Sequence, residues 1–362
     1  MLAAAYERHG NPSNVVEVKE IPKPPSPGQG LLLIKVSAAS LNPADFKSGK
    51  GEQAALLSFQ WPRVYGFDFS GEVVEAGPDT DPAHAPGAKV FGMIQGLPQL
   101  HRGTLSEFIL CPSSVCATKP ANISHIEAAA VPLVAITAVK MLEKCNPQPG
   151  AKILVLGGAG GVGSIAIQLA KKMYKCGELT TTASAGAKTE AVKSFGADVV
   201  VDYRSQKFEE VLPPNSFDVV LDCMGEAWRA VELLKEGGGM CSIQAGPTAT
   251  ALRTWMEEAK LDPNTVTTGV RLFLFSTVGG GLFNCFSGGR SLKAACEAKK
   301  ATFAHIIGTG NGQIMAEVAK LMASGEIKAV IDSEFELKDS VKAIEKLMGG
   351  RALGKVVVKV EK

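Results

Sequence analysis

The hydrophobic and polar positions follow two different patterns along the chain. From residue 1 to about 120, short alternating runs are separated by turns rich in proline and glycine, as in LLLIKVSAAS at 31–40 and AKVFGM at 88–93. Short, closely spaced strands with frequent turn residues are typical of an all-β unit. We therefore predict a partly open β-barrel domain over residues 1–124.

From about residue 150, apolar runs alternate with amphipathic segments. The pattern predicts strands at 151–158, 178–184, 217–225 and 239–246, and helices at 162–173, 187–196 and 226–238. Such alternation is typical of a parallel sheet covered by crossover helices. We predict a Rossmann domain, a doubly wound parallel sheet, over residues 125–330. Residues 331–362 return to a helix and a valine-rich strand, and are predicted to complete the first domain. The fold class is α/β.

A glycine-rich turn follows the first predicted strand of the second half. Gly158, Gly160 and Gly163 form a G-x-G-x-x-G pattern, with Gly161 and Val162 inside it, and a helical pattern follows. The first glycine permits a tight turn, the second lets a pyrophosphate approach the backbone, and the third lets the helix pack on the strand. The phosphates then lie at a helix N-terminus. The setting favours dinucleotide binding over a purely structural turn.

The next predicted strand indicates which dinucleotide binds. Sites that prefer NAD place an acid about 20 residues past the glycines, where it bonds the ribose 2′-hydroxyl. Here the region ends in Thr182, Ala183 and Ser184, Lys188 follows, and Tyr203 closes the strand after that. Hydroxyls and a cation without an acid suit a 2′-phosphate. We predict NADPH as the cofactor; the alternative for Lys188 is a solvated helix residue.

Composition excludes several classes of partner. The chain is 46% hydrophobic and 20% charged, with a formal charge of +2 and no basic run, which describes a globular protein with no reason to bind nucleic acid. None of the eight cysteines lies in a C-x-x-C pair, which indicates reduced, mostly buried thiols. The uncharged run at 272–286 is interrupted by glycines and shorter than the ~20 residues of a spanning helix. We predict a cytoplasmic protein without an integral membrane segment.

Several segments together resemble the medium-chain dehydrogenase/reductase superfamily over essentially the whole chain. They include SLNPADFKSG, PRVYGFDFSGEVVEAG, GTLSEF, SFGADVVVDYR and GRALGKVVV, in the order of that family. Within it, the chain is similar to the zinc-free quinone oxidoreductases and enone reductases. The resemblance implies a GroES-like barrel with a Rossmann domain and NADPH-dependent hydride transfer to small apolar electrophiles. These are quinones, or the C=C bond of α,β-unsaturated carbonyls. It also implies a homodimer.

The residues where related alcohol dehydrogenases bind zinc differ here. Those enzymes carry a cysteine near the position of Asn42 and a Gly-His-Glu where this chain has Gly66, Phe67 and Asp68. Phe67 cannot ligate a metal, and the five histidines show no paired ligand spacing. We predict no metal site.

The resemblance places Asn42, Asp45 and Lys47 beside the nicotinamide. Asn42 donates to the substrate oxygen or positions the nicotinamide, Lys47 contacts the cofactor phosphate, the ribose or the developing enolate, and Asp45 orients Lys47. The alternative is a plain Asn-Pro turn with solvated side chains. A tyrosine expected shortly after this segment is absent, so Tyr65 is the candidate proton donor, and water is the alternative.

The resemblance also places three later residues near the cofactor: Thr137, Gly354 and Lys355. The alternatives are a helix threonine bonded to its own backbone, a simple turn and a strand-edge lysine. Residues 271–286 are expected to pair in the dimer and to line the acceptor pocket. Two other functions stay open: an enoyl-thioester reductase, and a non-catalytic NADPH-binding scaffold or crystallin-like protein.

Overall fold

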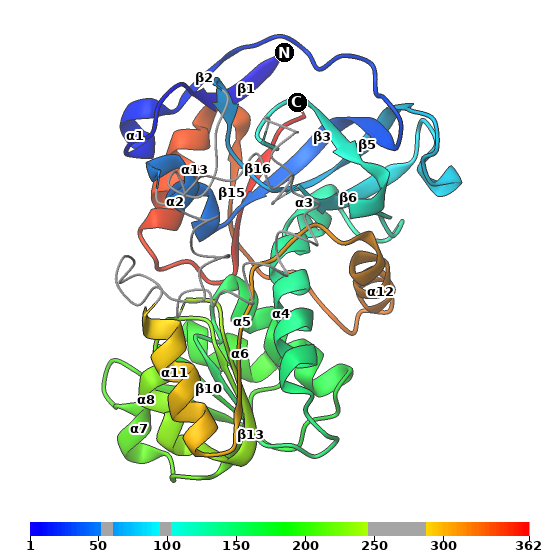
Figure 1. Ribbon diagram of the computed structural model, residues 1–362. Coiled ribbons are helices and arrows are strands. Elements are labelled where there is room, and N and C mark those ends of the chain that lie inside the picture. The colour runs from blue at the N-terminus through cyan, green and yellow to red at the C-terminus, as the bar shows by residue number, and fades with distance from the viewer. Residues whose placement is uncertain (52–60, 95–102, 245–286, 362) are drawn as a thin grey trace, which may run out of the picture. The chain divides into compact units, whose positions relative to one another are not determined.

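The computed structural model describes residues 1–51, 61–94, 103–244 and 287–361 (Figure 1). Their contacts divide into two units. Unit 1 comprises the described residues within 1–136 and 308–361, and unit 2 those within 137–244 and 287–307. The domain boundaries expected from the sequence, at 124 and 331, stay a prediction. The expected acceptor wall and dimer segment at 271–286 lies outside the described residues.

Unit 1 is built on mostly antiparallel strands around one long central strand. β3 (Leu31–Leu41) pairs with β5, β7 and β16, in a sheet of order β15-β16-β3-β5-β6-β8. The other strands are β5 (Asp68–Ala76), β6 (Lys89–Met93), β7 (Phe108–Pro112), β8 (Cys116–Thr118), β15 (Ile331–Glu336) and β16 (Lys355–Lys359). A second sheet has the order β2-β1-β4, made of Glu17–Glu20, Leu2–Tyr6 and Arg63–Val64.

Alternation along the strands explains how unit 1 forms its core. Leu32, Ile34 and Val36 of β3 are buried together with Val356 and Val358 of β16, because residues two apart share one face of a strand. β16 pairs with β3, so the C-terminal segment joins the first unit. The helices are α1 (Pro12–Val15), α2 (Pro43–Lys50), α3 (His125–Ala129), α12 (Gly312–Ala323) and α13 (Ser340–Met348), while α4 (Pro132–Cys145) leads into unit 2. Three 3₁₀ turns are Pro82–His84, Ser113–Val115 and Leu337–Asp339.

Unit 2 is a parallel six-stranded sheet of order β11-β10-β9-β12-β13-β14. From β9 the chain builds outward through β10 and β11, then returns to the other side of β9 for β12. Such a reversal is the point at which open α/β sheets bind ligands, outside the carboxyl ends of the strands. The strands are β9 (Ile153–Leu156), β10 (Leu179–Ala183), β11 (Val199–Asp202), β12 (Phe217–Asp222), β13 (Leu234–Ser242) and β14 (Thr302–His305).

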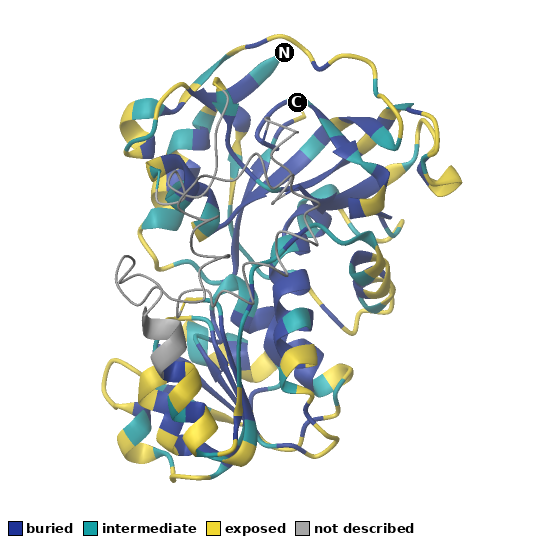
Figure 2. Ribbon diagram, viewed as in Figure 1, coloured by how far each residue is buried: buried dark blue, intermediate teal, exposed yellow. Residues whose placement is uncertain are grey.

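The helices of unit 2 cover this sheet, whose central strands β9, β10 and β12 are buried almost throughout, whereas the edge strands β11 and β14 are mostly half-buried (Figure 2). They are α5 (Gly161–Lys172), α6 (Ala187–Phe195), α7 (Phe208–Val211), α8 (Ala227–Ala230) and α11 (Ser287–Ala298), with a 3₁₀ turn at Val231–Leu233.

The helix predicted over 226–238 is wrong in its second half. The helical part ends at Leu233, and β13 begins at Leu234, which pairs with Phe217 of β12. Three consecutive glycines at 237–239 explain the difference, since each glycine costs a helix about 1 kcal/mol relative to alanine. The residues from Leu234 onward pair in parallel with β12 instead of forming a helix.

The described residues also show the state of the cysteines and the length of the apolar helices. Seven cysteines lie there, all of them free thiols and five of them buried. No helix in this part of the chain is long and apolar enough to cross a membrane.

Candidate active site

Asn42 lies where the central strand of unit 1 turns into a helix. β3 ends at Leu41, and Asn42 is the N-cap of α2, with extended backbone (φ −133°) and Pro43 after it. Proline suits the first helical position because its missing N–H needs no partner there. Asp45, three residues on, closes the cap: its Oδ2 accepts a hydrogen bond of 2.6 Å from the backbone N–H of Asn42. The Asn-Pro segment is therefore a capped helix start.

Strand pairing brings two charged residues to Asn42. Asp68 begins β5 and lies opposite Ser40, and Lys355 begins β16 next to Val356, which lies opposite Leu41. Asp68 Oδ2 accepts hydrogen bonds from Asn42 Nδ2 at 2.8 Å and from Ser40 Oγ at 3.0 Å. Lys355 Nζ lies 3.1 Å from the same oxygen and also donates to Asn42 Oδ1. We call Ser40, Asn42, Asp68 and Lys355 the Asp68 cluster.

The Asp68 cluster is buried, so its charged groups are costly unless they compensate one another. Asn42, Asp68 and Lys355 are 1%, 0% and 4% exposed. A buried ammonium group is strongly disfavoured unless a counter-charge and hydrogen bonds compensate it. Asp68 supplies that counter-charge, so the cluster keeps a cation beside an amide inside the protein.

Asp45 is buried next to the cluster with an incomplete set of partners. Its Oδ1 has no hydrogen-bond partner among the described residues. Burial, with Asp68 nearby, raises the pKa of Asp45 to about 8. Its hydrogen bond goes to the backbone of Asn42, not to Lys47, which lies half-buried on α2. The expected orientation of Lys47 by Asp45 is not seen in this arrangement.

Tyr65 lies in the core of unit 1. It is 2% exposed, its ring centroid is 4.8 Å from that of Tyr6, and burial raises its pKa. Its hydroxyl packs on Gly49, where a Cβ would come within 1.8 Å of it, and has no hydrogen-bond partner among the described residues. The phenol stays protonated, and its role as proton donor remains a prediction.

The three glycines of the turn in unit 2 have different surroundings. A Cβ on Gly158 would lie 2.1 Å from Thr181 Oγ1, and one on Gly163 would lie 2.3 Å from the carbonyl oxygen of Gly157. These two glycines allow close packing. A Cβ on Gly160 would meet only the Gly157 oxygen, at 3.4 Å. The backbone at Gly160, the N-cap of α5, is therefore open on the side where a pyrophosphate approaches in this type of turn.

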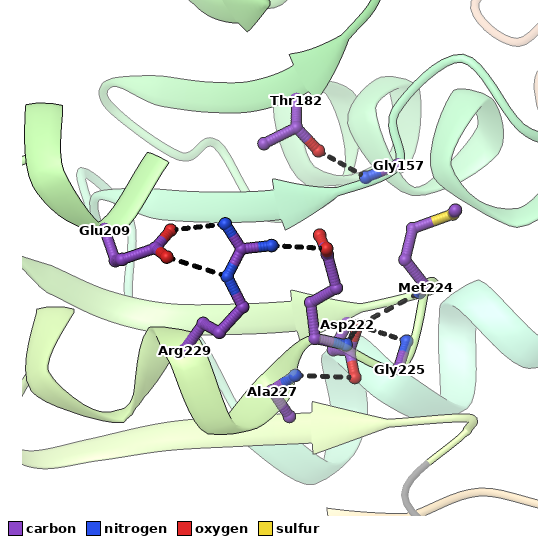
Figure 3. Close-up of polar contacts among 9 residues, drawn as sticks. Gly157, Thr182, Glu209, Asp222, Met224, Gly225, Ala227 and Arg229 are labelled. Atoms are coloured by element: carbon purple, nitrogen blue, oxygen red, sulfur yellow. Dashed lines mark hydrogen bonds and ion pairs between the residues drawn. The ribbon is translucent and has the colours of Figure 1, made fainter. Parts of the chain in front are cut away.

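Thr182 of the neighbouring strand β10 holds this turn. The N–H of Gly157 donates to Thr182 Oγ1 at 2.9 Å, as Figure 3 shows, and the N–H of Gly158 donates to the Thr182 carbonyl at 3.1 Å. Ser184 follows directly after β10 and is buried, whereas Tyr203 follows β11 and is exposed. With Lys188 on the first turn of α6, these groups lie at the carboxyl ends of adjacent strands. The residues present fit a phosphorylated dinucleotide.

Asp222 is a residue that the sequence reasoning missed. At the end of β12, its Oδ1 accepts the backbone N–H groups of Met224, Gly225 and Glu226 at 2.9–3.1 Å, and its Oδ2 accepts that of Ala227 (Figure 3). The carboxylate thus shapes the loop after β12. That loop places the Met224 side chain against Gly157, where a Cβ would be 2.6 Å from Met224 Cγ.

Three other expected site residues have defined positions. Thr137 is buried on α4, and Lys355 belongs to the Asp68 cluster. Gly354 has φ +80°, and a Cβ there would lie 2.2 Å from the carbonyl oxygen of Val330. Because other residues rarely adopt this conformation, Gly354 lets β16 begin at Lys355. In the part of the chain that the structure describes, no three His, Cys, Asp or Glu side chains group as metal ligands do.

A β unit with a buried polar cluster, combined with a Rossmann-type unit carrying a glycine-rich turn at a helix N-terminus, is typical of an oxidoreductase of the two-domain dehydrogenase class. Family models agree: "Alcohol dehydrogenase GroES-like domain" matches residues 28–121 and "Zinc-binding dehydrogenase" matches residues 195–358. The chain is 33% identical to the 2-methylene-furan-3-one reductase of Solanum lycopersicum, over 99% of this chain and 79% of that protein.

Two further proteins are similar. The chain is 36% identical to the chloroplastic NADPH-dependent alkenal/one oxidoreductase of Arabidopsis thaliana, over 70% of this chain and 65% of that protein. The solved structure of the quinone oxidoreductase from Coxiella burnetii has a TM-score of 0.79 and 26% identity, over 100% of this chain and 99% of that one. The chain belongs to the medium-chain dehydrogenase/reductase superfamily, among its quinone and enone oxidoreductases. The predicted GroES-like and Rossmann folds are thereby confirmed.

Proposed function

We propose that this oxidoreductase uses NADPH to reduce quinones or the C=C bond of α,β-unsaturated carbonyl compounds, without a catalytic metal. The observation that carries the proposal is the Asp68 cluster, which buries the Lys355 ammonium beside Asn42 and Asp68, at positions where the resemblance gives related alcohol dehydrogenases a cysteine and the glutamate of Gly-His-Glu. The activities for which the similar reductases are named support the same acceptors.

The acceptor chemistry explains why hydrogen-bond donors can replace a metal here. NADPH supplies a hydride when it is bound. As an electron-poor acceptor is reduced, negative charge develops on its oxygen, and donors aimed at that oxygen stabilise the transition state. We assign this role to Asn42 Nδ2 and Lys355 Nζ, which also donate to Asp68 Oδ2 within the cluster of unit 1. The remaining proton comes from water, so Tyr65 is not required as an acid.

Cofactor binding is assigned to the turn and strand ends of unit 2. We propose that the N–H groups at Gly160, Gly161, Val162 and Gly163 bind the pyrophosphate, since a helix N-terminus favours anions. Ser184, Lys188 and Tyr203 receive the phosphorylated ribose, and the end of β10, directly before Ser184, carries no carboxylate that would repel it. Roles for Lys47, Thr137 and Gly354 near the nicotinamide, assembly as a homodimer and a cytoplasmic location are further parts of the proposal.

Turnover by the purified chain tests this function. NADPH absorbance is followed with phenanthrenequinone, a panel of enones and an enoyl thioester, with NADH and an acceptor-free reaction as controls and a chelator added in parallel. We expect loss of NADPH with a quinone or enone, slower loss of NADH, and no effect of the chelator. Turnover only with the thioester favours the enoyl-thioester reductase, and tight NADPH binding without turnover favours a scaffold role. Activity that a chelator abolishes contradicts the metal-free mechanism.

A further inference from the structure

Asp68 is the central carboxylate of the cluster, yet its own oxygens are fully used inside the protein. Oδ2 takes three donors, from Ser40, Asn42 and Lys355, and Oδ1 accepts the backbone N–H of Leu133 at 2.8 Å. The side chain is 0% exposed. Because both of its oxygens are bonded to groups of the protein, Asp68 acts on its neighbours rather than on a substrate.

The first neighbour is the amide of Asn42, whose orientation the cluster determines. Lys355 Nζ donates to Asn42 Oδ1, while Asn42 Nδ2 donates to Asp68 Oδ2 at 2.8 Å. Turning the amide by half a rotation would set its N–H groups against the ammonium and its oxygen against the carboxylate, two repulsive contacts. The Asp68–Lys355 ion pair therefore selects one amide orientation. One of the two Nδ2 hydrogens goes to Asp68, and the Asn42 side chain also interacts with the neighbouring Asp45 carboxyl.

The second neighbour is the ammonium group of Lys355, 4% exposed. Asp68 is the carboxylate that contacts it among the described residues, and Asp45 acts on the same group from further away. Charged groups on the elements around β16 are engaged elsewhere: Asp332 of β15 pairs with Lys346 of α13, and Glu127 of α3 bonds Ser124. Without Asp68, none of the carboxylates described in the structure would contact the buried ammonium directly.

We propose that Asp68 is a positioning residue for the acceptor: it fixes the Asn42 amide and the Lys355 ammonium so that both present N–H groups to the oxygen that gains negative charge. Lys355 then serves the acceptor rather than the cofactor. This inference rests on the proposed function, and it extends that function to a residue outside the expected site motif.

A double-mutant cycle on turnover tests whether Asp68 acts through Asn42. Asp68→Asn keeps the size of the side chain but removes its charge and half of its acceptors. We expect kcat to fall about 30-fold, below the effect of losing a direct oxyanion donor, with the Kd for NADPH unchanged. In an Asn42→Ala background the same substitution should lower kcat less than about 3-fold, because residues that act as a unit are non-additive. Independent, additive losses would overturn the proposal.

A matched control comes from the other unit. Asp218 also pairs with one lysine, Lys235 at 2.7 Å, and accepts one backbone N–H, that of Lys152 at 2.8 Å, at the amino end of β12. Asp218→Asn should leave kcat unchanged. If Asp68→Asn fails to fold, Asp68→Asn combined with Lys355→Met replaces it, since that variant buries no unpaired charge. Wild-type kcat in the combined variant would overturn the proposal.

A spectroscopic probe separates this proposal from the proposed function. 4-Nitrophenol, whose phenolate is yellow, mimics an acceptor oxygen that carries negative charge. We expect the wild-type protein with NADP⁺ to enhance the phenolate band, and Asp68→Asn to lose that enhancement while Asp218→Asn keeps it. If the wild type shows the band but reduces no quinone or enone, Asp68 positioning stands and the acceptor class fails. If the wild type shows no enhancement, or Asp68→Asn retains it, the positioning role is wrong even where turnover is normal.

Discussion

The two candidate binding regions make their polar contacts with different parts of the chain. The turn of unit 2 offers backbone N–H groups from consecutive residues, at the start of α5. The Asp68 cluster of unit 1 uses side chains, and the contacts of its members span 26, 287 and 313 residues of sequence. A backbone site tolerates changes of side chain but no added Cβ at its close contacts. A side-chain site depends on every charged partner. The two regions should therefore fail in different ways when they are mutated.

Loss of the Asn42 amide should have the largest effect on turnover. Asn42→Ala removes one donor to the acceptor oxygen, and we expect kcat to fall about 100-fold or more while the Kd for NADPH stays the same. Stopped-flow oxidation of NADPH and fluorescence titration give the two values. Asn122→Ala is the control, because this exposed amide in unit 1 also donates one hydrogen bond, of 3.0 Å, to the Ala323 carbonyl. An equal weakening of NADPH binding in Asn42→Ala would assign Asn42 to the cofactor instead.

Cofactor choice should change almost as strongly in unit 2. Ser184→Asp places a carboxylate after β10, where it repels a 2′-phosphate and can bond a 2′-hydroxyl. We expect the ratio of kcat/KM for NADPH to that for NADH to fall about 100-fold, since juxtaposed like charges cost several kcal/mol. Ser184→Ala, which removes only the hydroxyl, should change this ratio far less. A ratio that the aspartate leaves intact would contradict the assignment of Ser184 to the phosphorylated ribose.

The glycine turn of unit 2 and the Asp68 cluster of unit 1 also differ in how far the sequence alone predicts them. The glycine turn is a local pattern in which strand, turn and helix are consecutive, so periodicity and glycine spacing suffice to place it. Asp68 begins a strand in GFDFSG, and nothing local indicates that Asn42 and Lys355 bond to it. Their contact depends on the register of β3 with β5 and β16. Asp222 was missed for a related reason, because its role consists of capping a loop whose course the sequence does not show.

The helix prediction over 226–238 is wrong for a similar reason: pairing with a distant strand decides the structure. The run EAWRAVELL has helical periodicity, and a helix does begin there, at Ala227. The competing factor was the edge of β12, which pairs with Leu234 and the residues after Gly238. Pairing across the sheet outweighed local helical preference once the glycines had weakened the helix.

Alanine in the glycine turn should separate folding from binding. Gly163→Ala puts a Cβ 2.3 Å from the Gly157 oxygen, so it should lower both the Tm and the affinity for NADPH. Gly160→Ala meets only one atom, at 3.4 Å, and has φ −80°, so the Tm should be nearly unchanged. Its methyl group nevertheless occupies the side that a pyrophosphate approaches, and we expect about 10-fold weaker NADPH binding. Thermal unfolding and fluorescence titration measure the two effects; full affinity in Gly160→Ala would exclude this face of the turn.

The smallest expected effect concerns the pH dependence of stability in unit 1. The pKa of Asp45 is raised from its ordinary 3.8 to about 8 in the folded chain, chiefly by burial. The folded state therefore binds this proton more tightly than the unfolded state, and the resulting stability is complete below about pH 4 and lost by about pH 8. Asp45→Asn mimics the protonated acid and can still accept the hydrogen bond from Asn42 N.

The Tm of Asp45→Asn relative to wild type should accordingly rise between pH 4 and pH 8, by about 3 °C, and stay level above that. Thermal unfolding across this range measures it. Asp339→Asn is the control, because that half-buried carboxyl pairs with Lys342 at 2.8 Å, which lowers its pKa, and should give no rise in this window. A difference in Tm for Asp45→Asn that is flat with pH would mean that Asp45 is ionised in the folded protein. The Asp68 cluster would then have a second negative charge beside it, and the Asp68 and Asp45 carboxylates would together balance the positive charge of Lys355.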